Sequence, residues 1–340
     1  MRSGRHISAI LLAAAALLIT FGCVKEPVKV PIAVAPSVEE TRALVEGDED
    51  LRTNAFSLLA AVTNNGNTSA AFGNDKLWYD GTNSIWTYGS PKYWVPLSHY
   101  TFGAFWPYAS TSESQLTNGA VSYSADGGIP TLTISGYNTG KGDTFDARSE
   151  DLLFTSYTRD NTAANDYSPV PLQMGHLLSS LYFQVRNATS NPITHITEIS
   201  LTGLKYKCDI TVTPSGSTIT HVNDVLGADG TCFTGEERTG DNTTPFLPAG
   251  MSEAQFKPLY HCTDLTVLPQ DVYGNTVILK FTVHFSGNAS GSEYSANLGT
   301  IESLTRWYPG KRYLYNFTIS SKDILFQVSE VDWIEHNVKL

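Results

Sequence analysis

The stretch TVILKFTVHF, residues 276–285, shows the pattern that decides the fold. Every second residue in it carries a large apolar side chain: Val277, Leu279, Phe281, Val283 and Phe285. The residues between them include Lys280, Thr282 and His284. Because successive side chains of a β-strand point to opposite faces, this alternation predicts a strand with one face in the core and one face toward water.

Two other stretches repeat the pattern, SSLYFQVRN at residues 179–187 and RYLYNFTIS at residues 312–320. Turn-forming sequences such as NNGN at 64–67 and YGN at 273–275 separate runs of this kind, and helical periodicity is scarce. Short strands at such spacing, rich in Tyr, Phe, Thr and Val, are typical of two sheets packed face to face. The sequence therefore predicts an all-β protein built from sandwiches.

Length and charge narrow the possibilities further. The chain has 340 residues, of which 16% are charged, and its formal net charge is −11. This acidic balance argues against nucleic-acid binding, which requires clustered Lys and Arg.

The length suggests two domains. The polar segment TRDNTAANDYSP at 158–169 is the candidate boundary, so we expect an N-terminal domain at 43–170 and a C-terminal domain at 171–340.

The N-terminus has the features of an export signal. Arg2 and Arg5 precede an apolar run at residues 9–20, and Cys23 follows it before a polar, Pro-rich tether. The run is shorter than the ~20 residues of a membrane-spanning helix. We therefore expect residues 1–22 to be a signal peptide and Cys23 to carry the lipid that anchors a precursor. A cleaved signal beside an incidental cysteine is the alternative.

No catalytic or cofactor site is expected. The Gly-rich stretch GYNTGKGD at 136–143 lacks the spacing of a phosphate-binding loop, and the histidines show no metal-ligand spacing. Cys208, Cys232 and Cys262 allow one disulfide or a set of buried thiols, and the spacing does not choose between them. We therefore expect no enzyme, no metal and no cofactor.

Aromatic residues crowd the window from Trp78 to Tyr108. Two interpretations remain open. The rings fill the core of the first sandwich, or some of them form an exposed patch that stacks on sugars or on a protein partner.

Several stretches, in their order along the chain, resemble the fimbrillins of Bacteroidia-type fimbriae, the type V pili. They are the lipobox-like end at Cys23, VPIAVAPSVEETRALVEGDED at 30–50, the aromatic block from KLWY to FWPY at 76–108, PVPLQMGHLLSSLYFQV at 169–185, and YPGKRYLYNFTISSKDILFQVSEVDWIE at 308–335. The resemblance covers nearly the whole chain after the signal. It implies two tandem transthyretin-like β-sandwich domains, export to the outer membrane as a lipoprotein precursor, and a place in a cell-surface fimbrium.

The resemblance also implies that a first strand is removed and that a strand of another subunit replaces it. Removal of a strand exposes apolar core and unpaired backbone groups, which an incoming strand can satisfy. In this sequence the removable strand is KVPIAVA at 29–35, with Val30, Ile32 and Val34 on one face.

Processing by an Arg-specific protease is part of the same expectation. Cleavage between Arg42 and Ala43 would release residues 23–42 together with the lipid, and Arg52 is the second candidate. An Arg42 that is never cut, as in an anchor-type subunit, is the alternative.

The replacement strand is expected from the C-terminal end. Ile324, Phe326 and Val328 alternate in the last strand and would insert into the next subunit. The alternative is that this strand completes its own sandwich. Partners are other fimbrillin subunits, while stalk, tip and anchor roles stay open. A second class of function is a surface lipoprotein or tip adhesin that binds glycan or a partner protein.

Overall fold

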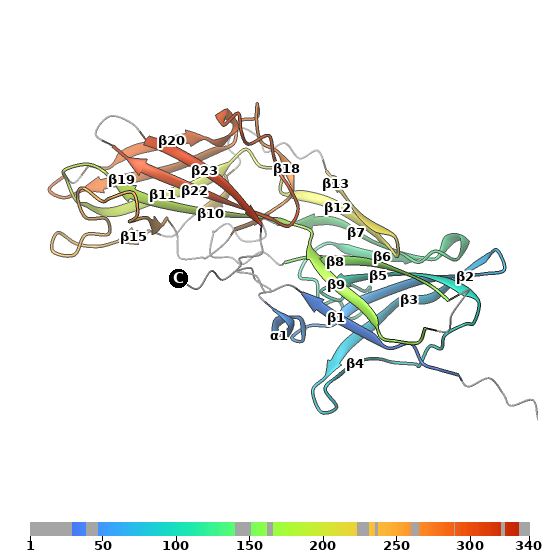
Figure 1. The fold of residues 1–340 in the computed structure, drawn as a ribbon. Helices are drawn as coiled ribbons and strands as arrows, with labels where there is room; N and C mark the ends of the chain where they lie inside the picture. Colours follow the sequence, from blue (N-terminus) through green and yellow to red (C-terminus); the bar gives the residue numbers. More distant parts are fainter. Residues whose placement is uncertain are drawn as a thin grey trace, which may run out of the picture.

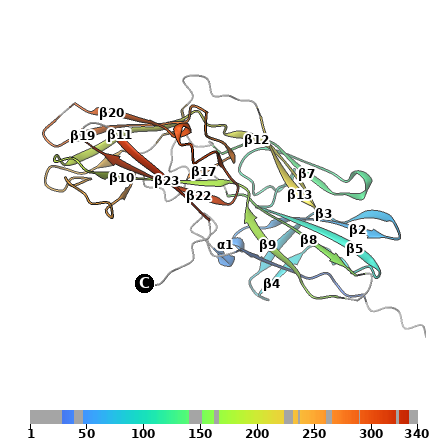
Figure 2. The ribbon, with the colours of Figure 1, turned by 45° about the horizontal axis from the view of Figure 1, so that its top comes forward.

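A computed structural model describes residues 29–38, 47–139, 151–161, 166–222, 231–234, 237–259, 265–288, 290–320 and 324–332. Within these ranges the secondary structure is almost entirely β, which confirms the predicted all-β class. The exceptions are the one-turn helix α1 (Asp48–Leu51) and two 3-10 turns, η1 (Asp126–Gly128) and η2 (Leu298–Thr300). No helix in the described ranges is long and apolar enough to cross a membrane. Figures 1 and 2 show the strands in two groups at opposite ends of an elongated molecule.

The first group contains a seven-stranded sheet. Its order is β1 (Val34–Val38), β9 (Val170–His176), β8 (Leu153–Asp160), β5 (Ser98–Trp106), β2 (Phe56–Asn64), β3 (Asn67–Asp80) and β4 (Ile85–Tyr88). All neighbours are antiparallel except β1 and β9, which run parallel.

A four-stranded antiparallel sheet packs against part of this one. Its order is β13 (Gly216–His221), β12 (Lys207–Thr213), β7 (Thr131–Asn138) and β6 (Ala120–Ser124). Leu59 of β2 and Phe105 of β5 share one apolar cluster with Leu132, Ile210 and other residues of the smaller sheet. The residues beside them in β2, such as Leu58, belong to a second cluster on the other face. The run FSLLAAV is therefore apolar on both faces because both faces are covered.

Three strand pairs join the chain on the two sides of residue 170. β9, which begins at that residue, pairs with β1 and with β8, and β12 pairs with β7 in the first group. The polar segment at 158–169 that suggested a boundary includes the end of β8 and part of the connection to β9. The pairing therefore does not divide the chain between 170 and 171.

The second group is a sandwich of two sheets. One has the order β16 (Lys257–Pro258), β10 (Ser179–Asn187), β22 (Lys311–Ile319) and β23 (Ile324–Asp332), with β17 (Leu265–Val267) also on β10. The other has the order β14 (Thr231–Thr234), β11 (Ile193–Thr202), β19 (Ile278–Phe285) and β20 (Ser292–Asn297), with β15 (Arg238–Thr239) also on β11. A short pair, β18 (Gln270–Asp271) with β21 (Arg306–Trp307), completes the group.

The core of this sandwich confirms the alternation read from the sequence. Most of the predicted inward residues of the three stretches are almost fully buried: Leu181, Phe183, Val185, Val277, Leu279, Phe281, Val283, Tyr313, Tyr315, Phe317 and Ile319. Phe285, at the end of its strand, is half-buried against the same core. Tyr315 accepts a 2.9 Å hydrogen bond from Nε1 of Trp307, so both polar atoms are satisfied inside the core. Burial raises the pKa of Tyr313 and of Tyr315 well above the ordinary value near 10.

These tyrosines predict a loss of stability at high pH. A folded-state pKa above the unfolded-state value means that the contribution to stability is complete below about pH 10 and is lost as pH rises through the folded pKa. We expect the free energy of unfolding in urea to fall from about pH 10 upward, by at most about 1.4 kcal/mol per pH unit for each tyrosine. Tyr315→Phe should make that decline less steep, whereas Tyr273→Phe, at an exposed tyrosine, should not change the slope. An equal slope for all three proteins would contradict the prediction.

Candidate functional site

The segment at residues 29–38 lies at the end of the seven-stranded sheet. Its β1 part pairs with β9 in parallel register, from Val34 opposite Val170 to Val38 opposite Met174. The N–H of Val170 donates a 2.8 Å hydrogen bond to the carbonyl of Ala33, so the pairing begins one residue earlier.

The start of the same segment contacts the opposite end of the sheet. The N–H of Ile32 donates to the carbonyl of Lys92 at 2.8 Å, and the N–H of Trp94 donates to the carbonyl of Val30 at 3.0 Å. The hydroxyl of Tyr88, in the end strand β4, donates to the carbonyl of Ile32 at 2.5 Å. The segment therefore contacts both β9 and the chain at and after β4, the two ends of the remaining sheet. These contacts mean that the sheet is curled and that the segment closes it. Figure 1 shows β1 beside β9.

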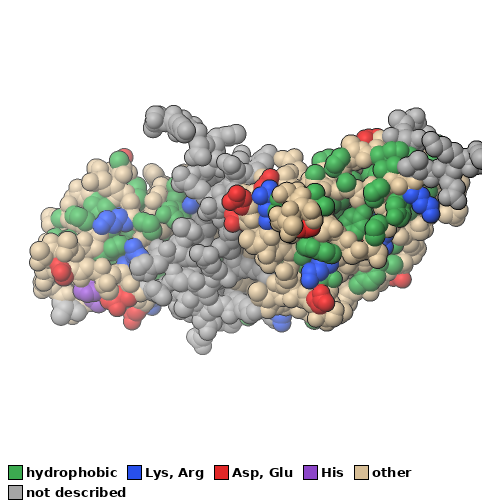
Figure 3. All heavy atoms as spheres, turned by 90° about the horizontal axis from the view of Figure 1, so that it is seen from below, with side chains coloured by type: hydrophobic (Ala, Val, Ile, Leu, Met, Phe, Trp, Pro, Cys, Tyr) green, Lys and Arg blue, Asp and Glu red, His purple; other side chains and the backbone are tan. Residues whose placement is uncertain are grey.

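The side chains of the segment alternate between core and solvent. Ile32 is 2% exposed, Val34 7% and Val38 9%, and all three belong to the apolar cluster inside the curled sheet, against which Val30 also packs. Pro31, Ala33 and Ala35 point outward. The structure thus places Val30, Ile32 and Val34 along one face. Figure 3 views the molecule from the side where β1 lies in Figure 1 and shows many apolar side chains at the end formed by the first group of strands.

Residues on either side of the segment are held together by Arg159, which is almost fully buried. Its guanidinium donates to the carbonyl of Ser168 at 2.5 Å and to that of Pro169 at 3.3 Å, immediately before β9. The same group lies over the ring of Trp94, 5.1 Å from the centroid. One cation therefore links the two stretches between which the segment lies. Sequence reasoning missed this role because Arg159 stands in a stretch that looked like a polar linker.

The end of β1 is connected to α1. The N–H of Val38 donates a 2.8 Å hydrogen bond to Oδ1 of Asp48. Cys23, Arg42 and Ala43 lie outside the described residues, so lipidation and cleavage there stay predictions.

The second cleavage candidate, Arg52, follows the last residue of α1. Its N–H bonds to the carbonyl of Glu49, the N–H of Thr53 bonds to that of Asp50, and its guanidinium lies 4.6 Å from the ring centroid of Tyr79. Proteolytic nicking prefers exposed, loosely held loops. Arg52 itself is exposed, and cleavage there stays a prediction.

The C-terminal strand β23 pairs along its length with β22, and it pairs with no other strand in the part of the chain that is described. Ile324, Phe326 and Val328 are half-buried against the core of the second group, and the ring of Phe326 lies 5.9 Å from that of Phe317. Leu325, between them, is 64% exposed. In this structure the expected donor strand thus completes the edge of its own sandwich.

The aromatic window divides between the two interpretations. Tyr100, Phe102 and Phe105 are fully buried, whereas Trp78 and Tyr93 are 38% and 45% exposed.

The cysteines are partly described. Cys208 is a free, buried thiol in β12, and burial raises its pKa to about 12. Cys262 and the side chain of Cys232 lie outside the described part of the chain. Among the described residues, no group of three or more His, Cys, Asp or Glu side chains is arranged to hold a metal ion.

Comparison with known proteins supplies the family. A family model described as fimbrillin-like matches residues 41–333. The chain belongs to the fimbrillin-like family. This confirms the resemblance drawn from the sequence and assigns the protein to a fimbrial structural family rather than to an enzyme family. No curated protein sequence matches the chain.

Solved structures show that this fimbrillin-like chain shares its fold with a fimbrial protein and with candidate cell adhesion proteins. A fimbrial protein from Bacteroides vulgatus is 18% identical, with a TM-score of 0.57 over 88% of this chain and 99% of that one. Candidate cell adhesion proteins from Bacteroides uniformis and Bacteroides ovatus are 17% and 15% identical, each with a TM-score of 0.51, over 89% and 92% of this chain and 98% and 100% of theirs. At such identities the similarity shows a common fold.

The role of Arg159 predicts a measurable loss of stability. Arg159→Lys keeps the positive charge but cannot bond two carbonyls while it covers Trp94. We expect the free energy of unfolding to fall by about 1–3 kcal/mol, the range for charged hydrogen bonds in a buried site. Arg306→Lys is the matched control, because Arg306 forms an exposed ion pair with Asp271 and should change stability by less than about 1 kcal/mol. Equal effects in urea unfolding would contradict the assigned role.

Proposed function

We propose that this protein is a structural subunit of a cell-surface fimbria that assembles by strand exchange. In this proposal the segment at 29–38 leaves, and a strand of another subunit takes its place. The observation behind the proposal is that this segment, near the start of the chain, closes the curled sheet between two other backbone stretches.

Departure of the segment would leave a slot in the sheet that favours the binding of another strand. The N–H groups of Val170 and Trp94 and the carbonyl of Lys92 would each lose a backbone partner. The apolar cluster that holds Ile32 and Val34 would also be opened to water. Unpaired backbone groups and exposed apolar surface both favour the addition of a strand.

The incoming strand must place apolar side chains at every second residue. Ile324, Phe326 and Val328 have that spacing, and their strand β23 has one described neighbour. They are half-buried, whereas Ile32 and Val34 are buried. We propose that β23 of one subunit enters the slot of the next, because it exposes less apolar surface on leaving its own sheet than it covers in the slot.

The steps before assembly are part of the same proposal. Residues 1–22 direct export, Cys23 carries the lipid that anchors the precursor in the outer membrane, and an Arg-specific protease cuts between Arg42 and Ala43. Arg42 is preferred to Arg52 because Arg52 follows a hydrogen-bonded helical turn. After the cut, the segment would be held by non-covalent contacts alone, which allows exchange.

Limited digestion of the purified full-length chain with an Arg-specific protease tests this proposal. We expect cleavage after Arg42, followed by a ladder of oligomers on native electrophoresis that Arg42→Ala abolishes. Cleaved protein that stays monomeric with residues 29–38 still bound would contradict strand exchange.

The donor strand is tested by two substitutions on β23. Phe326→Asp should abolish the ladder, because a carboxylate would have to enter the apolar slot. Gln327→Asp adds the same charge on the exposed side of the strand and should leave the ladder intact. Thermal melting of the uncut variants separates loss of folding from loss of exchange, since Phe326→Asp should cost about 1–3 kcal/mol in its own sandwich. A ladder formed by folded Phe326→Asp protein would rule out this strand as the donor.

A further inference from the structure

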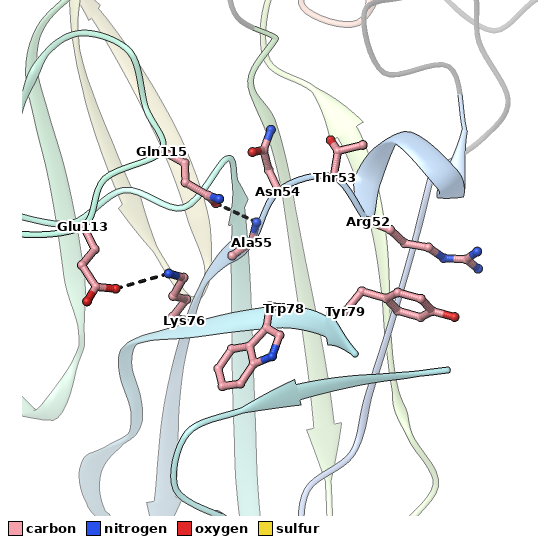
Figure 4. A pocket seen from close by; sticks show the side chains of 9 residues that line it. All are labelled: Arg52, Thr53, Asn54, Ala55, Lys76, Trp78, Tyr79, Glu113 and Gln115. Atoms are coloured by element: carbon pink, nitrogen blue, oxygen red, sulfur yellow. Dashed lines mark hydrogen bonds and ion pairs between the residues drawn. The ribbon is translucent and has the colours of Figure 1, made fainter. Parts of the chain in front are cut away.

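A cleft of about 570 Å³ lies beside α1. It is formed by the chain between α1 and β2, by the end of β3, and by the connection between β5 and β6 (Figure 4). It shares no residue with the segment at 29–38. Strand exchange gives no role to the residues that line this cleft.

The most unusual residue in the cleft is Trp78. Its side chain is 38% exposed, whereas the other described tryptophans are buried or half-buried. Figure 4 shows the ion pair of Lys76 with Glu113 on one side of it and Arg52 beside the ring of Tyr79 on the other. A partly exposed indole ring offers a flat apolar face on which a ligand can pack.

Two carboxamides add directed hydrogen-bonding groups. Oε1 of Gln115 accepts a 2.7 Å hydrogen bond from the N–H of Ala55, and this bond orients the side chain so that its amide nitrogen is left to donate elsewhere. Asn54 also lines the cleft, and its side chain takes part in none of the described hydrogen bonds. Each carboxamide can therefore offer donors to a ligand, and that of Asn54 an acceptor as well.

The charged groups at the two ends are held by local partners. Nζ of Lys76 lies 3.2 Å from Oε2 of Glu113 and 5.4 Å from the ring centroid of Tyr108. The guanidinium of Arg52 lies over Tyr79. Both signs of charge are present, so the cleft offers paired donors and acceptors rather than a field of one sign.

We propose that this cleft binds a saccharide. The C–H face of a pyranose ring would pack on Trp78, and its hydroxyls would bond to the carboxamides of Asn54 and Gln115 and to the Lys76–Glu113 pair. An apolar peptide side chain fits less well, because apart from the two aromatic rings the lining has Ala55 as its one apolar residue. The proposal is independent of strand exchange and adds a ligand-binding activity to the subunit.

Saturation-transfer NMR on the uncut full-length protein tests this proposal. The probes are disaccharides of glucose, galactose, mannose and N-acetylglucosamine, each at millimolar concentration. We expect at least one of them to bind and to shift tryptophan fluorescence. Trp78→Ala should weaken binding by about tenfold or more, because it removes the stacking surface. Tyr273→Ala, at an exposed aromatic residue of the second group, should leave binding unchanged.

A second variant guards against effects on folding. Gln115→Glu keeps an oxygen to accept the bond from the N–H of Ala55 but loses the amide donor, so it should weaken binding while the melting temperature stays near that of the parent. Binding of none of the disaccharides, or undiminished binding by folded Trp78→Ala protein, would overturn the proposal. Because the measurement uses uncut monomer, its outcome does not depend on whether strand exchange occurs.

Discussion

The N-terminal group of strands depends on one arrangement of hydrogen bonds, the double pairing of residues 30–38. A seven-stranded sheet twists because its strands twist, and the twist brings its two ends toward each other. Here the ends meet through a short segment that bonds to β9 on one side and to residues 92–94 on the other. The apolar cluster within the curl, from Phe56 to Met174, is sealed by Ile32, Val34 and Val38.

This closure solves the problem of sheet edges in a particular way. An open edge invites pairing with other chains, and closed sheets avoid it. The closing strand here comes from the first described residues of the chain and joins the rest through residues 39–46, so it is separable in sequence from the sheet it completes. Arg159 links Trp94 to the residues before β9 and does not itself belong to that strand. The residues on both sides of the segment are thus also linked to each other by a contact that does not involve the segment.

The two ends of the molecule differ in how firmly their terminal strands are bound. Ile32 and Val34 are buried, and the backbone of their segment bonds to residues 92–94 near its start and to β9 from Ala33 onward. The apolar residues of β23 are half-buried, and its backbone pairs with β22. The chain that shows this asymmetry is a member of the fimbrillin-like family. The cleft around Trp78 has no lining residue in either strand.

The sequence by itself determined the strands and their inward faces, because the period of two in runs such as TVILKFTVHF survives wherever one face is buried. It also determined the alternation of Val30, Ile32 and Val34, and the family. Tertiary structure alone decided which strands are neighbours. The pairing of β1 with β9 joins residues more than a hundred positions apart. β12, in the second half of the sequence, pairs with β7, in the first half. Local periodicity contains no information about such partners, since any strand edge offers the same backbone groups. For the same reason the contacts of Arg159 and the exposure of Trp78 became visible only once distant segments were brought together.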